Sequence, residues 1–480
     1  MVFSSLIFLY VFLPVFLTSY YLAPIRWRNH VALIGSLLFY AWGEPVFAGV
    51  LILSSLCDYG LSHGLAHPGK GPAYRRGVLT VGLILNLGLL GYFKYANFFV
   101  GQTNGLLAWL GQGSLVWTHI ALPIGISFFT FQKISYLVDV YRGTAKPARS
   151  FTDFLLFVAL FPQLIAGPII RYHDVAEQIR ERAHTADKFL SGLWRFTLGL
   201  GKKVLIANQL GAVADLLFKQ EIATLPMPYA WTAILCYTFQ IYFDFAGYSD
   251  MAIGLGRMMG FEFAENFNHP YTARSVTDFW RRWHCSLSTF MRDYLYIPLG
   301  GNRGRAWRTG LNLWLVFLAS GFWHGASWNF VAWGAYHGTF LSLEKGFRHG
   351  RLAHIPAVLS WAFTFLVICC GWVIFHTETI ADAGHFLQRM IAFDSWSGVT
   401  DRVGLFWPDV ISHRATGMLV LAAIVSFIPD TVWTRWGWDQ ACPTPGWQSA
   451  GRIALGTICL LLATASLANQ SYNPFIYFRF

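Results

Sequence analysis

Two histidines in strongly apolar surroundings are the residues of this sequence best suited to chemistry. His324 lies in a stretch without Asp, Glu, Lys or Arg that runs from Thr309 to Leu343, and His284 stands forty residues earlier. Hydrocarbon offers an imidazole no hydrogen bonds, so a histidine at membrane depth has either a protein partner or a functional role. A buried imidazole stays neutral and can accept a proton. We therefore expect His324 to be the general base that activates a hydroxyl nucleophile.

Glycines around His324 indicate close packing of the elements that carry it. Gly321 and Gly325 flank the histidine at a spacing that lets helices approach closely, and Gly334 and Gly338 repeat that spacing. Close packing around an imidazole favours a shaped site. The alternative is a core histidine whose ring is held by a neighbouring backbone carbonyl.

The segment 278–293, which contains His284, is predicted to form one helix. Residues 275–278 (Ser-Val-Thr-Asp) provide a capping box at its start. Three polar residues would share one narrow face of this helix, with His284 at its margin: Arg281, Ser288 and Arg292. Such a helix either lines a polar cavity or lies in the membrane interface and binds lipid headgroups. In the second case His284 would only hold a loop carbonyl.

Composition places these residues in an all-α polytopic membrane protein. The 480 residues are 55% hydrophobic and 12% charged, with a mean hydropathy of +0.45, whereas soluble domains carry about 25% charged residues. The net charge of +11 fits Lys and Arg in cytoplasmic loops, not nucleic-acid binding. Seven scattered cysteines without a C-x-x-C pair indicate neither a zinc site nor a disulfide framework.

Apolar stretches predict about 11 membrane spans, with additional re-entrant pieces. The stretches lie near residues 3–22, 31–43, 46–66, 78–100, 119–138, 151–170, 189–213, 229–252, 311–343, 357–376, 416–433 and 452–468. The uncharged run 309–343 exceeds one span and should contain a break. Basic clusters follow the first, third and fifth stretches, which predicts that the N-terminus lies outside the cytoplasm.

Two further polar features remain open to more than one interpretation. Asp244 and Asp250 end an apolar stretch; they could bind a cation or a proton, but pairing with an arginine is the favoured interpretation. The arginine-rich region 274–308 suits a donor with several phosphates, and solvated arginines of a cytoplasmic loop are the equal alternative.

Several motifs resemble the membrane-bound O-acyltransferase family, in its bacterial branch that acetylates exopolysaccharides. The resemblance covers nearly the whole chain, and its specificity comes from the set, not from any single piece. The motifs are FWRRWH (279–284), DYLYIPLGGN (293–302), WHGA (323–326), PIGISFFTFQ (123–132), FPQLIAGP (161–168) and YFDFAGYSDM (242–251).

The resemblance implies one transmembrane domain over residues 1–480, with a catalytic core at about 119–345. The fold would be a ring of about 11 tilted helices around a tunnel, in the bacterial inner membrane. The reaction would be acetyl transfer from a cytoplasmic donor such as acetyl-CoA, towards a secreted polysaccharide such as alginate or cellulose. Periplasmic acetylation proteins would be partners, and no metal or resident cofactor is expected. A precursor flippase and a non-catalytic scaffold of an export complex are the rival functions.

The resemblance also assigns roles to individual residues. His324 and His284 would be catalytic, and four residues would bind the donor: Arg281, Arg292, Ser288 and Asn329. The chain ends in the aromatic-rich segment 472–480, which is either an interfacial anchor or a segment that folds back into the tunnel mouth. In the second case the phenol of Tyr477 would carry the acetyl group transiently.

Overall fold

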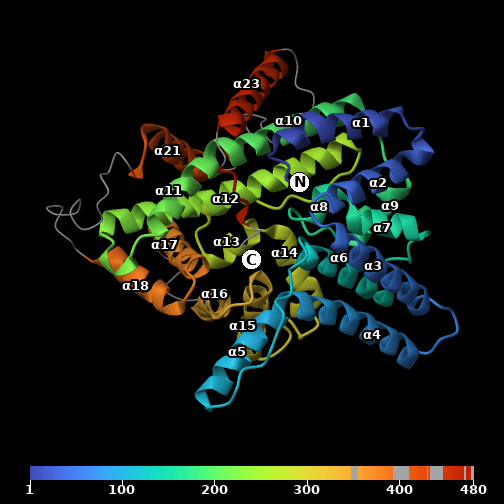
Figure 1. The fold of residues 1–480 in the computed structure, drawn as a ribbon, viewed down its shortest axis with the longest axis horizontal. Helices are drawn as coiled ribbons and strands as arrows, with labels where there is room; N and C mark the ends of the chain where they lie inside the picture. Colours follow the sequence, from blue (N-terminus) through green and yellow to red (C-terminus); the bar gives the residue numbers. More distant parts are fainter. Residues whose placement is uncertain (348–354, 393–409, 430, 433–446, 470–471, 477–480) are drawn as a thin grey trace. The chain divides into compact units, whose positions relative to one another are not determined.

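The computed structural model describes residues 1–347, 355–392, 410–429, 431–432, 447–469 and 472–476 (Figure 1). Across these residues every regular element is a helix, as the sequence predicts. The chain forms two compact units. Unit 1 comprises Met1–Phe189 and Leu255–Ala264, and unit 2 comprises Leu190–Gly254 and Glu265–Phe480.

Unit 1 is a bundle of helices whose starts are fixed by prolines in several places. Its α-helices are α1 (Leu13–Leu22), α2 (Arg28–Ala41), α3 (Pro45–Leu65), α4 (Pro72–Leu90), α5 (Ala96–Trp109), α6 (Ile126–Arg142), α7 (Phe151–Ala159), α8 (Phe161–Leu164) and α9 (Tyr172–Arg180). Pro45 and Pro72 stand in the first turns of α3 and α4, where a missing backbone N–H costs no helical hydrogen bond. Gly82 lets α4 approach Leu137 of α6.

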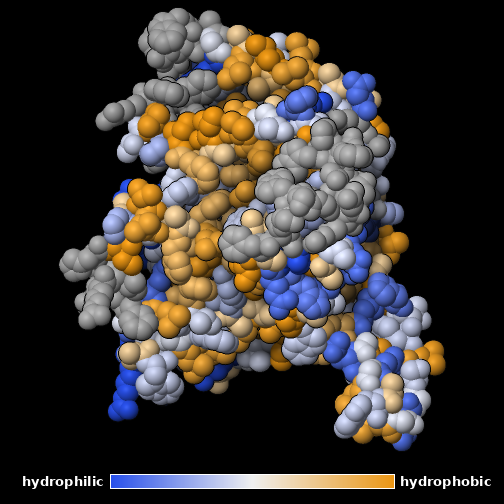
Figure 2. Space-filling model, turned by 90° about the vertical axis from the view of Figure 1, so that its left-hand side faces the viewer, coloured by the Kyte–Doolittle hydropathy of each residue, from blue (hydrophilic) through white to orange (hydrophobic). Residues whose placement is uncertain are grey.

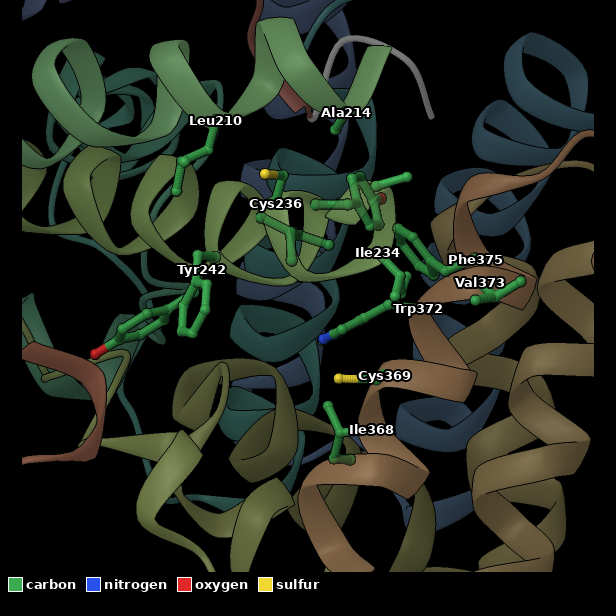
Figure 3. Packing of buried hydrophobic residues seen from close by; sticks show 14 of the residues in the cluster. Leu210, Ala214, Ile234, Cys236, Tyr242, Ile368, Cys369, Trp372, Val373 and Phe375 are labelled. Atoms are coloured by element: carbon green, nitrogen blue, oxygen red, sulfur yellow. The ribbon is translucent and has the colours of Figure 1, made fainter. Parts of the chain in front are cut away.

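Unit 2 holds most of α10 (Ala186–Gly201), followed by a π-helical turn (Lys202–Ala207), α11 (Asn208–Phe218) and α12 (Met227–Met258). The remaining α-helices are α13 (Val276–Arg282), α14 (Cys285–Met291), α15 (Ala306–His324), α16 (Trp328–Phe347), α17 (Ala357–His376), α18 (Ile380–Ile391), α21 (His413–Phe427) and α23 (Trp447–Asn469). Helices α11, α12 and α17 contribute to one apolar cluster, which includes Leu210, Ile234 and Trp372 (Figure 3).

Glycines permit the closest helix packing in unit 2. A side chain at Gly199 or Gly254 would collide with the backbone of the facing helix, because α10 and α12 approach at the pairs Gly199/Gly247 and Gly192/Gly254. The same holds for α15 and α16, where Gly321 meets the Phe330 carbonyl oxygen. The close approach predicted around His324 is therefore confirmed.

The uncharged run 309–343 is broken as predicted, because α15 ends at His324 and α16 begins at Trp328. Within the described residues, four helices are long and apolar enough to cross a membrane: Pro45–Leu65, Pro72–Trp109, Ala357–His376 and Gly451–Asn469. Phe8–Leu22 and His413–Phe427 are shorter apolar helices. The count of about 11 spans stays a prediction.

Large apolar side chains lie on the outer surfaces of these helices. Val358 and Leu359 of α17 and Ile453 and Leu461 of α23 are exposed, and Figure 2 shows hydrophobic patches interspersed with polar residues on one face. Large contiguous apolar surfaces are rare on soluble monomers. Such surfaces suit contact with lipid.

Candidate active site

His284 occupies a break between α13 and α14, so the prediction of one continuous helix over 278–293 is wrong at Trp283 and His284, where the helix is interrupted. The predicted cap is confirmed, since Ser275 Oγ accepts a hydrogen bond from the backbone N–H of Asp278 at 3.0 Å. Helix α13 then ends at Arg282, and His284 adopts φ 45° and ψ 54°. This left-handed conformation costs a non-glycine residue about 1–2 kcal/mol. Residues held in such conformations often belong to functional sites.

The segment at Asn266 stabilises this break through backbone and side-chain hydrogen bonds. The backbone N–H of Cys285 donates to the Asn266 carbonyl at 2.9 Å, and that of Asn268 donates to the Arg282 carbonyl at 2.9 Å. These bonds replace the helical bonds that the left-handed residue interrupts.

The Asn266 side chain also sets the orientation of the His284 imidazole. Its Nδ2 donates to Ser249 Oγ at 3.0 Å, so its Oδ1 is the atom that faces His284 Nδ1, also at 3.0 Å. Ser286 Oγ donates to the same Oδ1 at 2.8 Å. Because an amide oxygen only accepts, Nδ1 of the imidazole carries the hydrogen and Nε2 carries the lone pair.

His324 is the last residue of α15 and is 7% exposed. Three aromatic rings surround its imidazole: Trp323 at 4.9 Å, Trp333 at 5.2 Å and Phe375 at 5.3 Å between ring centroids. Walls of this kind exclude water and keep the local dielectric low, which strengthens electrostatic interactions at the site.

The two histidines come together at Trp323, although they belong to different elements. The Trp323 ring centroid lies 4.9 Å from that of His324 and 6.3 Å from that of His284. The His284 ring also lies 4.6 Å from the Phe245 ring between centroids, and the two ring planes are nearly perpendicular. With His284 1% exposed, the result is a buried aromatic site that contains two imidazoles.

Three further residues of this site were not singled out from the sequence. Asn266 sets the imidazole orientation described above. His337 is buried and accepts a 3.4 Å hydrogen bond from Trp280 Nε1. Trp333 lies between His324 and His337, at 5.2 and 5.0 Å between ring centroids. Its buried Nε1 has no hydrogen-bond partner among the described residues. One signal in the sequence was available, since His337 lies on the same uncharged stretch as His324.

The four residues expected to bind the donor occupy different environments. Arg281 is exposed, and Arg292 forms an exposed ion pair with Asp293 at 2.7 Å. Ser288 Oγ donates to the Trp280 carbonyl at 2.9 Å. Asn329 is buried, and its Nδ2 donates to the Thr377 carbonyl at 2.6 Å.

The family model of the membrane-bound O-acyltransferases matches residues 148–375, which include both histidines. The chain is 42% identical to the "Probable alginate O-acetylase AlgI" of Azotobacter vinelandii and 43% identical to that of Pseudomonas putida, over the full length of each chain. It is 38% identical to the "Peptidoglycan O-acetyltransferase" of Helicobacter pylori, which covers 83% of this chain and 81% of that protein.

The chain belongs to the membrane-bound O-acyltransferase family. It is therefore a membrane-bound acyltransferase, as the motifs indicate. Membership of the family implies that it uses an acyl donor and a polysaccharide acceptor. Membership also favours the enzyme over the flippase and the scaffold as the function of this chain.

In this acyltransferase the two acidic residues of α12 are engaged in ion pairs. Asp250 contacts Arg195 at 2.6 Å and Lys202 at 2.6 Å, so the predicted arginine pairing is confirmed. Asp244 pairs instead with Lys203, at 2.5 Å. Tyr477 lies outside the described residues.

Proposed function

We propose that this acyltransferase moves an acetyl group from acetyl-CoA on the cytoplasmic side of the bacterial inner membrane towards a secreted polysaccharide. One observation supports this most strongly: His284 and His324, forty residues apart in sequence, flank the ring of Trp323 in a buried aromatic site. The relatives named for O-acetylation of alginate and peptidoglycan support acetyl as the group and a cell-surface glycan as the acceptor.

In the proposed reaction His324 acts as general base. Its imidazole takes the proton of the acceptor hydroxyl while the hydroxyl oxygen attacks the thioester carbonyl carbon. The resulting tetrahedral intermediate collapses with cleavage of the carbon–sulfur bond. The thiolate leaves and receives the proton from the His324 imidazolium, which regenerates the base and gives an ester and a thiol.

Two neighbours of His324 are proposed to support this step. His284 presents its Nε2 lone pair to the reacting groups because Asn266 holds Nδ1–H, so it can orient a hydroxyl donor. Trp333 Nε1–H is the donor that we assign to the oxyanion of the intermediate. A buried hydrogen-bond donor aimed at a developing charge is a principal source of catalytic stabilisation.

The donor site is proposed to lie at the arginine-rich segment 274–308, on the cytoplasmic side. The exposed Arg281 and the partly paired Arg292 can bind phosphates bidentately, while Ser288 and Asn329 complete the proposed set. Charge reversal at Arg281 or Arg292 should weaken donor binding, and the penalty should shrink as salt increases. Labelling of residue 303 from the outer face of the membrane would refute this topology.

The wider architecture is part of the same proposal. One transmembrane domain over residues 1–480, with a core at about 119–345, would form a ring of about 11 spans around a tunnel. Periplasmic acetylation proteins would complete the transfer. Tyr477 would accept the acetyl group on its phenol oxygen and release it as the next acceptor attacks. If the Tyr477→Phe variant acetylated the polymer normally, Tyr477 would be only an interfacial anchor.

The deciding experiment follows labelled acetyl-CoA in membranes that contain the enzyme, its periplasmic partner proteins and its polymer. We expect label in the polymer from the parent and none from His324→Ala, with His284→Ala impaired less severely. His385→Ala is the matched control, because His385 is an exposed histidine of α18 in the same unit. Acetylation by His324→Ala near the parental level would contradict the proposal and favour the scaffold.

A further inference from the structure

The last described residues of the chain, 472–476, fold back onto unit 2 after α23 (Figure 1). We name them the C-terminal strap. Phe475 is 7% exposed and Ile476 is 3% exposed. A chain end without tertiary contacts is normally poorly ordered. The burial of Phe475 and Ile476 therefore implies that unit 2 has a binding site for the strap.

A buried lysine–aspartate pair binds the backbone of the strap. Lys203 Nζ lies 2.5 Å from Asp244 Oδ1, and both side chains are at most 3% exposed. Lys203 Nζ also donates to the Pro474 carbonyl oxygen. Asp244 Oδ2 accepts from the backbone N–H of Ile476 at 2.9 Å. The Lys203 ammonium thus binds the carbonyl of Pro474, and the Asp244 carboxylate binds the backbone N–H of Ile476, two residues later on the strap.

Side-chain contacts fix the register of the strap in this site. Tyr472 OH donates to Asp215 Oδ2 at 2.7 Å, and Asn208 Nδ2 donates to Asn473 Oδ1 at 3.1 Å. The Phe475 ring stacks on Tyr248 at 4.8 Å. Room for Tyr472 depends on Gly211, where a Cβ atom would lie 3.0 Å from the phenol oxygen and 2.5 Å from Gln240.

Helix α12 connects this strap site to the histidine site. Asp244 and Tyr248, one turn apart, contact the strap. Their immediate neighbours Phe245 and Ser249 are also one turn apart and lie on the adjacent face of the helix. Phe245 meets the His284 ring at 4.6 Å, and Ser249 accepts from Asn266, which orients that ring.

We propose that Lys203 and Asp244 form a peptide clamp for the C-terminal strap, and that the clamped strap positions α12 behind His284. The clamp itself needs no assumption about the reaction, whereas the second part rests on the proposed function. A merely stabilising core would not need these charges, because a buried ion pair is often no more stabilising than apolar residues of similar volume. The two charges are explained by the two opposite backbone groups that they bind.

The first test measures hydrogen exchange of the C-terminal peptide by mass spectrometry, in detergent and without substrate. The double variant Lys203→Met/Asp244→Leu leaves no unpaired buried charge and should fold, but exchange at Ile476 should accelerate about a hundredfold. The matched control is Asp58→Leu/Lys133→Met, which removes a buried lysine–aspartate pair of unit 1 and should leave the strap protected. Equal exchange in the parent and the clamp variant would overturn the clamp.

The charge swap Lys203→Asp/Asp244→Lys separates peptide recognition from simple ion pairing. The swap restores a pair, but it places a carboxylate at the Pro474 carbonyl and an ammonium at the Ile476 N–H. We expect normal thermal stability and an unprotected strap. A strap protected as in the parent would show that the pair serves stability alone.

The second test asks whether the strap positions the histidine site. A chain that ends at Asn469 should lose protection in residues 243–250 and lose acetyl transfer, and a synthetic peptide of residues 470–480 should restore both. Restored protection of α12 does not depend on activity, so it separates failure of this proposal from failure of the proposed function. Unchanged protection of residues 243–250 after truncation would refute the positioning role.

Discussion

A buried polar cluster of unit 1 and the histidine site of unit 2 use their polar side chains differently. In unit 1, Asp58 of α3 lies 3.4 Å from Lys133 of α6 and accepts a 2.8 Å hydrogen bond from Asn86 of α4. These groups bond to one another and tie three helices together. In unit 2, the imidazoles of His284 and His324 lie among aromatic rings and are uncharged in their proposed working state. Charged groups that pair with one another in the interior are suited to a structural role, whereas an oriented neutral base is suited to catalysis.

The largest expected effect separates the two regions by activity. His324→Ala should reduce acetyl transfer about a thousandfold or more, because the general base is lost. The midpoint of thermal unfolding should fall only modestly, since the substitution leaves a cavity among aromatic rings that can partly close. Transfer rates and unfolding midpoints measured on the same purified protein check this. A large loss of stability in His324→Ala would indicate that His324 has a structural role.

The converse variant in unit 1 should act on stability. Asp58→Asn leaves the Lys133 ammonium buried beside a neutral amide and should lower the free energy of unfolding by about 3 kcal/mol. The transfer rate per folded molecule should not change. Replacing both partners, as in Asp58→Leu/Lys133→Met, should recover most of the stability. If the single variant lost turnover at normal stability, the contrast between the two units would fail.

Trp333→Phe sharpens the assignment within unit 2. The substitution keeps an aromatic ring beside His324 but removes the indole N–H that we assign to the oxyanion. Loss of one such donor should reduce kcat about a hundredfold with little change in KM. Steady-state kinetics with acetyl-CoA distinguish this from a packing defect, which would raise KM or lower the yield of folded enzyme. A kcat within twofold of that of the parent would show that Trp333 does not stabilise the oxyanion.

Asn266 should give the smallest effect, because it acts through His284. Asn266→Leu removes the acceptor that fixes Nδ1–H of His284, and the loss of one hydrogen bond should slow transfer about tenfold. Asn266→Asp keeps an acceptor oxygen at the same place and should restore part of the rate. A purely structural role predicts the same rate for both variants once folding is equal, which would contradict the positioning role.

The amino-acid sequence alone determined the class of this protein and much of its helical outline. Apolar stretches interrupted by basic clusters predicted an all-helical membrane protein, and local patterns also predicted the Ser275 cap and a break somewhere within the uncharged run 309–343. These features depend on residues that are close together in the sequence, so hydrophobic periodicity and helix-capping patterns can predict them. The motifs around both histidines predicted the family as well.

Tertiary structure decided the features that depend on distant partners. Helical periodicity gave no sign that His284 takes φ 45°, because the bonds that hold it come from Asn266, eighteen residues away. Nor could local pattern pair Lys203 with Pro474, which are 271 residues apart. A buried polar group needs a hydrogen-bond partner, which can come from any part of the chain that folding brings near it. A sequence pattern can indicate that the group is buried, but it does not identify that partner.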